Sequence, residues 1–202
     1  MWYLYTKMSR YPRAHPDPIQ FVENKTKFIT FNYDRSLEYF FNECYTTGHT
    51  FVNPSKNDLQ ISLNEKFSHV YGKVSKLSWE RSGKEFFVGF RGYETDYHTL
   101  ELLSKNIFLI NERENLKRYK SLRQTISSAD RIFFLGFSYQ DENLQVLDIP
   151  NIFNENQKIF GTAFQMTNNE IAKIRGKLRG NMKSQNIQIR NMDCLELLRE
   201  FL

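Results

Sequence analysis

Cysteine and glycine are both scarce in this chain of 202 residues. The two cysteines, Cys44 and Cys194, lie far apart in the sequence. They exclude a disulfide framework and every zinc module that needs four cysteines, and they indicate a reducing compartment. Nine glycines are present, and none of them lies within residues 1–25. The N-terminal segment therefore contains no glycine-rich phosphate loop.

Long hydrophobic runs are absent as well. No segment approaches the roughly 18 consecutive apolar residues that a transmembrane helix requires. Residues 1–13 lack the apolar core of a signal peptide. We therefore expect a cytoplasmic protein without membrane contact. The net charge is +5 with dispersed basic residues, which is typical of a solvated surface and not of a polybasic tail.

Aromatic residues, in contrast, are plentiful. The chain has 18 Phe, 11 Tyr and 2 Trp, within 40% hydrophobic and 25% charged residues. This composition is typical of a folded domain and excludes global disorder. The aromatic side chains suit a compact α/β or α+β core, and some of them could stack on a planar ligand.

Short apolar segments alternate along the chain with segments of helical periodicity. Strands are expected at 28–33, 67–71, 132–135, 158–164 and 187–189, with weaker strand material at 86–88. Helices are expected at 37–45, 114–128, 141–147, 168–178 and 193–202, whereas residues 96–110 give no clear pattern. The alternation predicts an α/β fold, a Rossmann-like, mostly parallel sheet with helices on both faces.

Two segments of unequal size are expected. Residues 1–25 form an N-terminal element and a proline-rich loop, because three prolines occur between Arg10 and Pro18. Residues 26–202 form the α/β domain. The apolar start at Trp2 has no capping residue before it, so we expect a fold that is incomplete at its N-terminus.

Polar residues or glycines lie at the ends of three of the predicted strands. They are Asn32 and Asp34 at the end of the first, His69, Tyr71 and Gly72 at the end of the second, and Gly136, Ser138 and Asp141 at the end of the third. Each has a structural alternative, such as a turn, a helix cap or a buried histidine. Ligands of parallel sheets bind at the carboxyl ends of the strands. Taken together, these residues therefore predict a binding site at that edge.

Two of these segments resemble the sirtuin-like (silent-information-regulator-type) domain family. That family carries Thr-x-Asn-x-Asp between a strand and a helix, and this chain has Thr30-Phe-Asn32-Tyr-Asp34 there. A later strand of the family ends in Gly-x-Ser, which corresponds to Gly136-Phe-Ser138. The order and the spacing of the two motifs both match, over about residues 26–202.

Two weaker motifs fall at the family's positions. The segment His69-Val-Tyr71-Gly72 lies where the family has His-Gly, and Asp193-Cys194 resembles the closing segment near the adenine site. The absence of four zinc-binding cysteines points away from a deacylase of the usual sirtuin type. It fits the bacterial sirtuin-like proteins that lack zinc and cleave NAD, often in phage defence.

The resemblance implies an NAD site without a metal. NAD or ADP-ribose would be the substrate or ligand, and hydrolysis of NAD to nicotinamide and ADP-ribose would be the activity. Asn32 would position the ribose or a water molecule, and Asp34 would accept a hydrogen bond from the carboxamide. Gly136 and Ser138 would approach a ribose, with Gly72, Asp193 and Cys194 as further cofactor-binding residues.

The chain departs from the family at its catalytic histidine. Tyr71 occupies that position and His69 lies two residues earlier, so either of them is the acid–base candidate beside Asn32. Tyrosine is a poor base, because its reference pKa is about 10. With the missing glycine turn, this leaves open an alternative: a catalytically inactive module that binds a nucleotide, a protein or a nucleic acid.

Two charged features also have alternative interpretations. Arg35 could contact a ligand phosphate or pair with Glu38 through helical spacing. The basic residues between 173 and 183 are more typical of a solvated helix face than of a nucleic-acid contact. Nucleic acid is therefore a less favoured partner than NAD or ADP-ribose. The sequence leaves the oligomeric state open, with a homo-oligomer among the alternatives.

Overall fold

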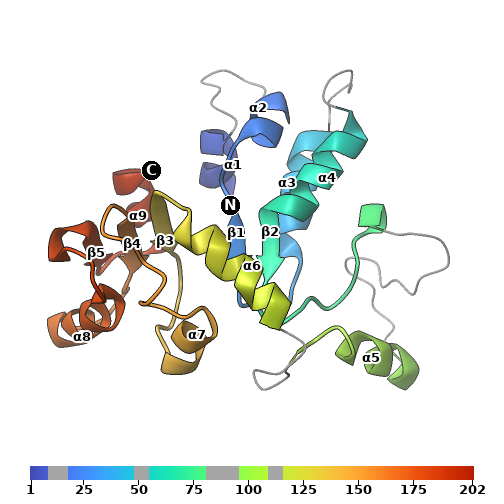
Figure 1. Cartoon of the computed structure of the whole chain (residues 1–202). Helices are drawn as coiled ribbons and strands as arrows, with labels where there is room; N and C mark the ends of the chain where they lie inside the picture. Colours follow the sequence, from blue (N-terminus) through green and yellow to red (C-terminus); the bar gives the residue numbers. More distant parts are fainter. Residues whose placement is uncertain (9–17, 48–54, 81–95, 109–115) are drawn as a thin grey trace. The chain divides into compact units, whose positions relative to one another are not determined.

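The structure is a computed structural model that describes residues 1–8, 18–47, 55–80, 96–108 and 116–202. The chain divides into two compact units, Met1–Glu112 and Arg113–Leu202, and each is described by itself (Figure 1). Both units are mixed α/β structures with short parallel sheets. The structure thereby confirms the α/β class and the parallel strands. The weak strand at 86–88 and the proline-rich loop before Pro18 lie outside the described residues.

The first unit holds a two-stranded parallel sheet. Its elements are α1 (Trp2–Met8), α2 (Pro18–Glu23), β1 (Phe28–Thr30), α3 (Ser36–Thr46), α4 (Lys56–Lys66), β2 (Phe67–His69) and α5 (Tyr97–Ser104). Strands β1 and β2 pair with Phe28 opposite Phe67 and Thr30 opposite His69. Because the strands run parallel in this register, Asn32 and the residues after His69 leave the sheet at the same edge.

An aromatic core fixes helix α3 against this sheet. Phe41 and Tyr45 are fully buried, and Tyr45 lies 4.6 Å from the ring of Phe21 between centroids. The rings of Phe28 and Phe67 stack across the two strands at 4.5 Å. Residues three, four or seven positions apart share one face of a helix. The same packing therefore turns Glu38, three residues before Phe41, toward the interior.

The second unit holds a three-stranded parallel sheet in the order β3-β4-β5. Its elements are α6 (Leu116–Ser127), β3 (Arg131–Phe134), α7 (Asp141–Val146), β4 (Lys158–Thr162), α8 (Asn168–Arg179), β5 (Ile187–Arg190) and α9 (Cys194–Phe201). Helix α8 packs on β5 and α9 on β4. Strand β4 is central, with Gly161 opposite both Phe134 and Ile189. The three strand ends therefore lie next to one another.

Side-chain caps explain where several helices begin. Thr167 caps α8 and Asp193 caps α9, and each forms a capping box with a glutamate three residues later. Helix α4 begins in the same way, because Ser55 and Asp58 cap each other. Helices α2, α4 and α5 were not predicted from the sequence. Helix α5 occupies part of the segment that gave no clear pattern.

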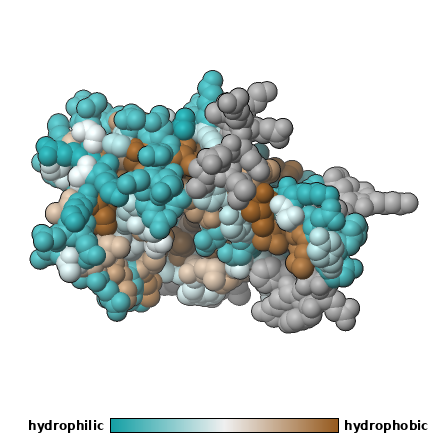
Figure 2. All heavy atoms as spheres, turned by 90° about the horizontal axis from the view of Figure 1, so that it is seen from below, coloured by the Kyte–Doolittle hydropathy of each residue, from teal (hydrophilic) through white to brown (hydrophobic). Residues whose placement is uncertain are grey.

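Figure 2 shows one face of the molecule, where hydrophilic side chains predominate and apolar ones gather in smaller patches. Among the described helices, none is both long and apolar enough to cross a membrane.

Candidate functional site

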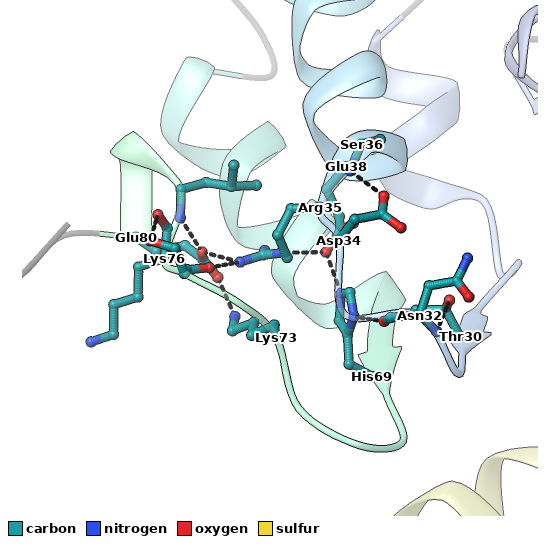
Figure 3. Close-up of polar contacts among 12 residues, drawn as sticks. Thr30, Asn32, Asp34, Arg35, Ser36, Glu38, His69, Lys73, Lys76 and Glu80 are labelled. Atoms are coloured by element: carbon teal, nitrogen blue, oxygen red, sulfur yellow. Dashed lines mark hydrogen bonds and ion pairs between the residues drawn. The ribbon is translucent and has the colours of Figure 1, made fainter. Parts of the chain in front are cut away.

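The strand edge of the first unit is organised around His69. Its imidazole is buried, with 5% of the residue exposed. Nδ1 lies 2.8 Å from the backbone oxygen of Asn32, and Nε2 lies 2.8 Å from Oε1 of Glu38 (Figure 3). One histidine at the end of β2 therefore joins the loop after β1 to helix α3.

Both contacts of His69 are made to hydrogen-bond acceptors. A backbone carbonyl and a carboxylate accept hydrogen bonds and cannot donate them. The imidazolium ring can donate to both, whereas the neutral ring can donate to only one. Each ring nitrogen of His69 therefore faces an acceptor oxygen, one from the loop after β1 and one from helix α3.

The contacts continue from Glu38 through a line of charged side chains. Arg35 Nε donates to Glu38 Oε1 at 2.6 Å, and its Nη1 donates to Glu80 Oε2 at 2.7 Å. Lys73 Nζ donates to the other oxygen of Glu80 at 2.6 Å, and the backbone of Leu77 donates to Glu80 at 2.7 Å. The alternative in which Arg35 pairs with Glu38 is thus confirmed (Figure 3).

The environment of the two glutamates keeps both of them ionised. Burial would raise the pKa of Glu38, but the hydrogen bond from His69 and the charge of Arg35 outweigh it and lower the pKa. Burial opposes ionisation of Glu80 in the same way. The hydrogen bonds from Arg35 and Lys73 nevertheless bring the pKa of Glu80 down to about 2. Both carboxylates can therefore act as fixed negative charges near neutral pH.

Asn32 and Asp34 are exposed at this edge. The side-chain amide of Asn32 points away from the His69 ring in Figure 3, and its backbone nitrogen donates to Thr30 Oγ1 at 3.1 Å. Asp34 Oδ1 accepts a hydrogen bond from the backbone of Ser36 at 3.0 Å. Asp34 is not the N-cap residue, because Arg35 takes that place. Both polar side chains are accessible to a ligand.

Tyr71 and Gly72 lie beside this loop. The Tyr71 ring is buried and meets the ring of Phe31, the residue before Asn32, edge to face at 5.6 Å between centroids. Gly72 has a φ of +90°, and a Cβ there would lie 2.0 Å from the backbone oxygen of Asn106. The close approach of two backbones therefore requires glycine at position 72.

The strand edge of the second unit brings together other predicted residues. Gly136 is exposed with a φ of +60°, and its backbone nitrogen donates to Thr162 Oγ1 at 2.9 Å. An added Cβ at Gly136 would lie 4.0 Å from Sγ of Cys194. Ser138 is exposed two residues further along. The end of β3 and the start of α9 therefore meet at this edge.

Two predicted aspartates have structural partners. Asp193 caps α9, and its Oδ1 accepts from the backbones of Leu195 and Glu196 at 2.7 and 2.9 Å. Asp141 pairs with Lys177 at 2.7 Å. Lys177 belongs to the predicted basic cluster, and another member, Arg175, donates to the backbone oxygen of Ile189 at 2.8 Å. Lys177 and Arg175 of this cluster therefore form contacts within the second unit.

The predicted site residues therefore fall into two groups. The first unit holds Asn32, Asp34, His69, Tyr71 and Gly72, and the second holds Gly136, Ser138, Asp193 and Cys194. Glu38 and Glu80 were missed as members of the first group. The helical spacing of Glu38 with Phe41 and Tyr45 could have revealed Glu38. No sequence signal links Glu80, which lies far along the chain, to Arg35.

Within the described ranges, no three His, Cys, Asp or Glu side chains form a group that could hold a metal ion. The assignment of His69, Tyr71 and Asn32 to catalysis stays a prediction. In the comparisons with known proteins, no family model, no curated protein and no solved structure matches the chain. The sirtuin-like resemblance therefore rests on the motifs in the sequence.

Proposed function

We propose that this chain is a sirtuin-like domain with a Rossmann-like fold that binds NAD or ADP-ribose and hydrolyses NAD to nicotinamide and ADP-ribose, in a role such as phage defence. The observation that carries the proposal is the exposed amide of Asn32, on a loop held by the buried His69. A rigid loop that presents a polar side chain at the carboxyl edge of parallel strands is typical of a ligand site.

The proposed reaction needs positioning more than a strong base. Water adds to C1′ of the ribose, the C1′–N bond breaks, and nicotinamide leaves with the bonding electron pair. The proton of the attacking water passes to solvent or to a nearby base. Because the transition state resembles an oxocarbenium ion, negative or dipolar groups next to it lower the barrier. Asn32 would orient the water or the ribose, and Asp34 would hold the carboxamide.

His69 takes a positioning role in this proposal. Both of its ring nitrogens already have partners, Asn32 and Glu38, so the ring is engaged by the protein. It holds the backbone of Asn32 in place, and Asn32 in turn meets the substrate. Tyr71, one residue before Gly72, is then the remaining acid–base candidate.

The contacts of both His69 nitrogens also favour a second function, binding of a nucleotide without catalysis. With His69 engaged at both nitrogens and tyrosine as a weak base, the domain could bind ADP-ribose without turnover. A domain of this kind would act as a nucleotide-responsive binding module. Binding would still stabilise the fold, by about 2.7 kcal/mol at a ligand concentration one hundred times Kd.

Nicotinamide release from NAD by the purified chain tests the two functions. We expect release by the wild type and its loss in Asn32→Ala. The matched control is Asn156→Ala, an exposed asparagine at the opposite, amino end of β4, which should leave the rate unchanged. Release that persists in Asn32→Ala would refute the site. No release, together with a rise in Tm on adding ADP-ribose, would instead support the binding module.

A further inference from the structure

Helices α2 and α4 of the first unit pack against each other and leave an open groove between them. The groove has a volume of about 430 Å³, which lies within the range of small-ligand sites. Its apolar lining comes from Ile19 and Val22 of α2 and from Ile61 of α4. Ile19 and Ile61 have 36% and 48% of their surface exposed. An occupant with an apolar body would therefore cover hydrophobic surface that faces water.

Three exposed carboxylates line the same groove. Glu23 comes from the end of α2, whereas Asp58 and Glu65 both belong to α4. Among the described residues, none of the three forms an ion pair with a basic side chain. Hydrogen bonds from the side chain and backbone of Ser55 lower the pKa of Asp58. The chain carries a net charge of +5, so its overall charge does not account for this local excess of negative charge.

A buried hydroxyl also reaches this groove. Ser62 lies on α4 between Asp58 and Glu65, one helical turn from each, and 7% of the residue is exposed. Within the part of the chain that the structure describes, its hydroxyl has no hydrogen-bond partner and is not enclosed by protein. The hydroxyl is therefore open toward the groove, where it can accept a hydrogen bond from a cationic ligand.

The separation of the carboxylates favours an elongated cation over a single metal ion. Asp58 and Glu65 are seven residues apart on α4, which corresponds to a rise of about 10 Å along the helix axis. Glu23 belongs to the other helix. In the described ranges, no three acidic, histidine or cysteine side chains are grouped closely enough to hold a metal ion. A cation with its charges spaced along an apolar chain matches both the separated carboxylates and the apolar lining.

We propose that the groove between α2 and α4 is a binding site for a linear aliphatic polyamine of the spermidine type. The ammonium groups of the ligand would pair with the three carboxylates, and the methylenes between them would lie on the two exposed isoleucines. Ser62 would accept a hydrogen bond from the ammonium group that lies between the carboxylates of α4. The groove does not include the strand edge that carries Asn32. This inference is therefore independent of the proposed cleavage of NAD.

Binding of spermidine to the full chain, measured by calorimetry at low ionic strength, tests this inference. Spermidine should bind about threefold more tightly than putrescine, because putrescine carries one ammonium group fewer. The double variant Glu23→Gln/Glu65→Gln should weaken spermidine about tenfold, since two of the three pairs are lost. The matched control is Glu142→Gln/Glu155→Gln, which changes the net charge equally at two exposed glutamates outside the groove, and its affinity should equal that of the wild type.

Thermal unfolding separates binding from a structural effect of the substitutions. Without spermidine, the Tm of Glu23→Gln/Glu65→Gln should stay close to that of the wild type, because both side chains are exposed. Spermidine should raise the Tm of the wild type and of the control variant, since a ligand that binds the folded state stabilises it. At the same spermidine concentration, the Tm of Glu23→Gln/Glu65→Gln should rise less. Magnesium chloride at matched ionic strength should not reproduce the shift.

Several outcomes would overturn the polyamine site. One is equal spermidine affinity in Glu23→Gln/Glu65→Gln and the wild type, and another is a wild-type chain that binds no spermidine. Magnesium that displaces spermidine at equal concentration would show that the groove attracts any counter-ion. A lysine-rich peptide that binds where spermidine does not would assign the groove to a protein partner instead. Spermidine binding that depends on the two glutamates would support the site, whether or not the chain releases nicotinamide from NAD.

Discussion

His69 and Glu38 form a buried pair that joins the end of strand β2 to the first turn of helix α3. Nε2 of His69 lies 2.8 Å from Oε1 of Glu38, and the two side chains are 4% and 3% exposed. The same carboxylate oxygen also accepts from Arg35 at 2.6 Å. Glu38 therefore lies between two positively polarised groups, and the loop that carries Asn32 depends on this carboxylate.

We expect Glu38→Gln to destabilise the first unit by about 3 kcal/mol, because it leaves Arg35 buried with one carboxylate fewer. Urea unfolding followed by circular dichroism would measure the loss. Glu65→Gln is the matched control, since Glu65 is exposed on α4, and it should change stability by less than about 0.5 kcal/mol. Equal effects of the two substitutions would contradict a structural role for the buried charge.

Acid should weaken the fold through Glu80. The pKa of Glu80 is about 2 in the folded chain and 4.5 for an unperturbed glutamate. The unfolded state therefore binds more protons between these values, and stability falls as the pH drops from about 4.5 toward 2. Above about pH 4.5, Glu80 makes its full contribution to the stability of the fold.

Urea midpoints measured from pH 6 to pH 2.5 would reveal this dependence. Glu80→Gln should be less stable than the wild type at pH 6, and the difference should shrink steadily below pH 4.5. A difference that stays constant down to pH 2.5 would show that Glu80 is not held ionised by Arg35 and Lys73.

Raising the pH above about 8 should stabilise the fold through Lys66. This residue is buried at the end of α4, donates to the backbone oxygen of Asn24, and lies 5.3 Å above the ring of Phe21. Burial, with repulsion from Lys27, lowers its pKa from 10.5 to about 8. The unfolded state binds the proton more tightly in this window. Stability should therefore rise as the pH increases from about 8 to 10.5.

Lys66→Met isolates this effect, because methionine keeps the length of the side chain and carries no charge. The stability of Lys66→Met minus that of the wild type should decrease between pH 8 and pH 10.5. Lys56→Met, at the exposed start of the same helix, should show no such trend. If the stability difference between Lys66→Met and the wild type does not change with pH, Lys66 is not the group that titrates in this range.

Most of the secondary structure could be predicted from the sequence, because the patterns that indicate helices and strands involve neighbouring residues. Thr167 and Asp193 are of residue types that favour the N-cap position, and each caps the helix that follows it. Helix α4 was missed because its apolar residues are few, although the Ser55-x-x-Asp58 capping box marks its start. Where the periodicity was clear, as in α3 and α8, the predicted and observed helices agree.

The candidate site could be predicted only in part. Asn32 and His69 were identified because they lie at the ends of predicted strands, and the parallel pairing of β1 and β2 brings them together. The contact of Arg35 with Glu80 depends on the path of the chain after β2, which brings Glu80 next to the residue that precedes α3. A pairing between residues far apart in sequence leaves no periodic or spacing signal. The contacts of Glu80 with Arg35 and Lys73 were therefore visible only in the structure.

Gly72 gives a sharp test of the strand edge itself. Its φ is +90°, and a Cβ would come within 2.0 Å of the Asn106 backbone oxygen. Gly72→Ala must therefore move one of two backbone segments, and we expect a loss of about 3 kcal/mol or more. Because Gly72 lies three residues after His69, the loop of Asn32 should shift too, and any binding of ADP-ribose should weaken.

Gly176→Ala is the control, because an added Cβ at this position in α8 has no atom within 4 Å. Alanine is the better helix former by roughly 0.5–1 kcal/mol, so this substitution should stabilise the second unit. Thermal unfolding of both variants would give shifts of opposite sign. A Gly72→Ala variant as stable as the wild type would mean that the chain after β2 does not run against Asn106, and that the edge carrying Asn32 is built differently.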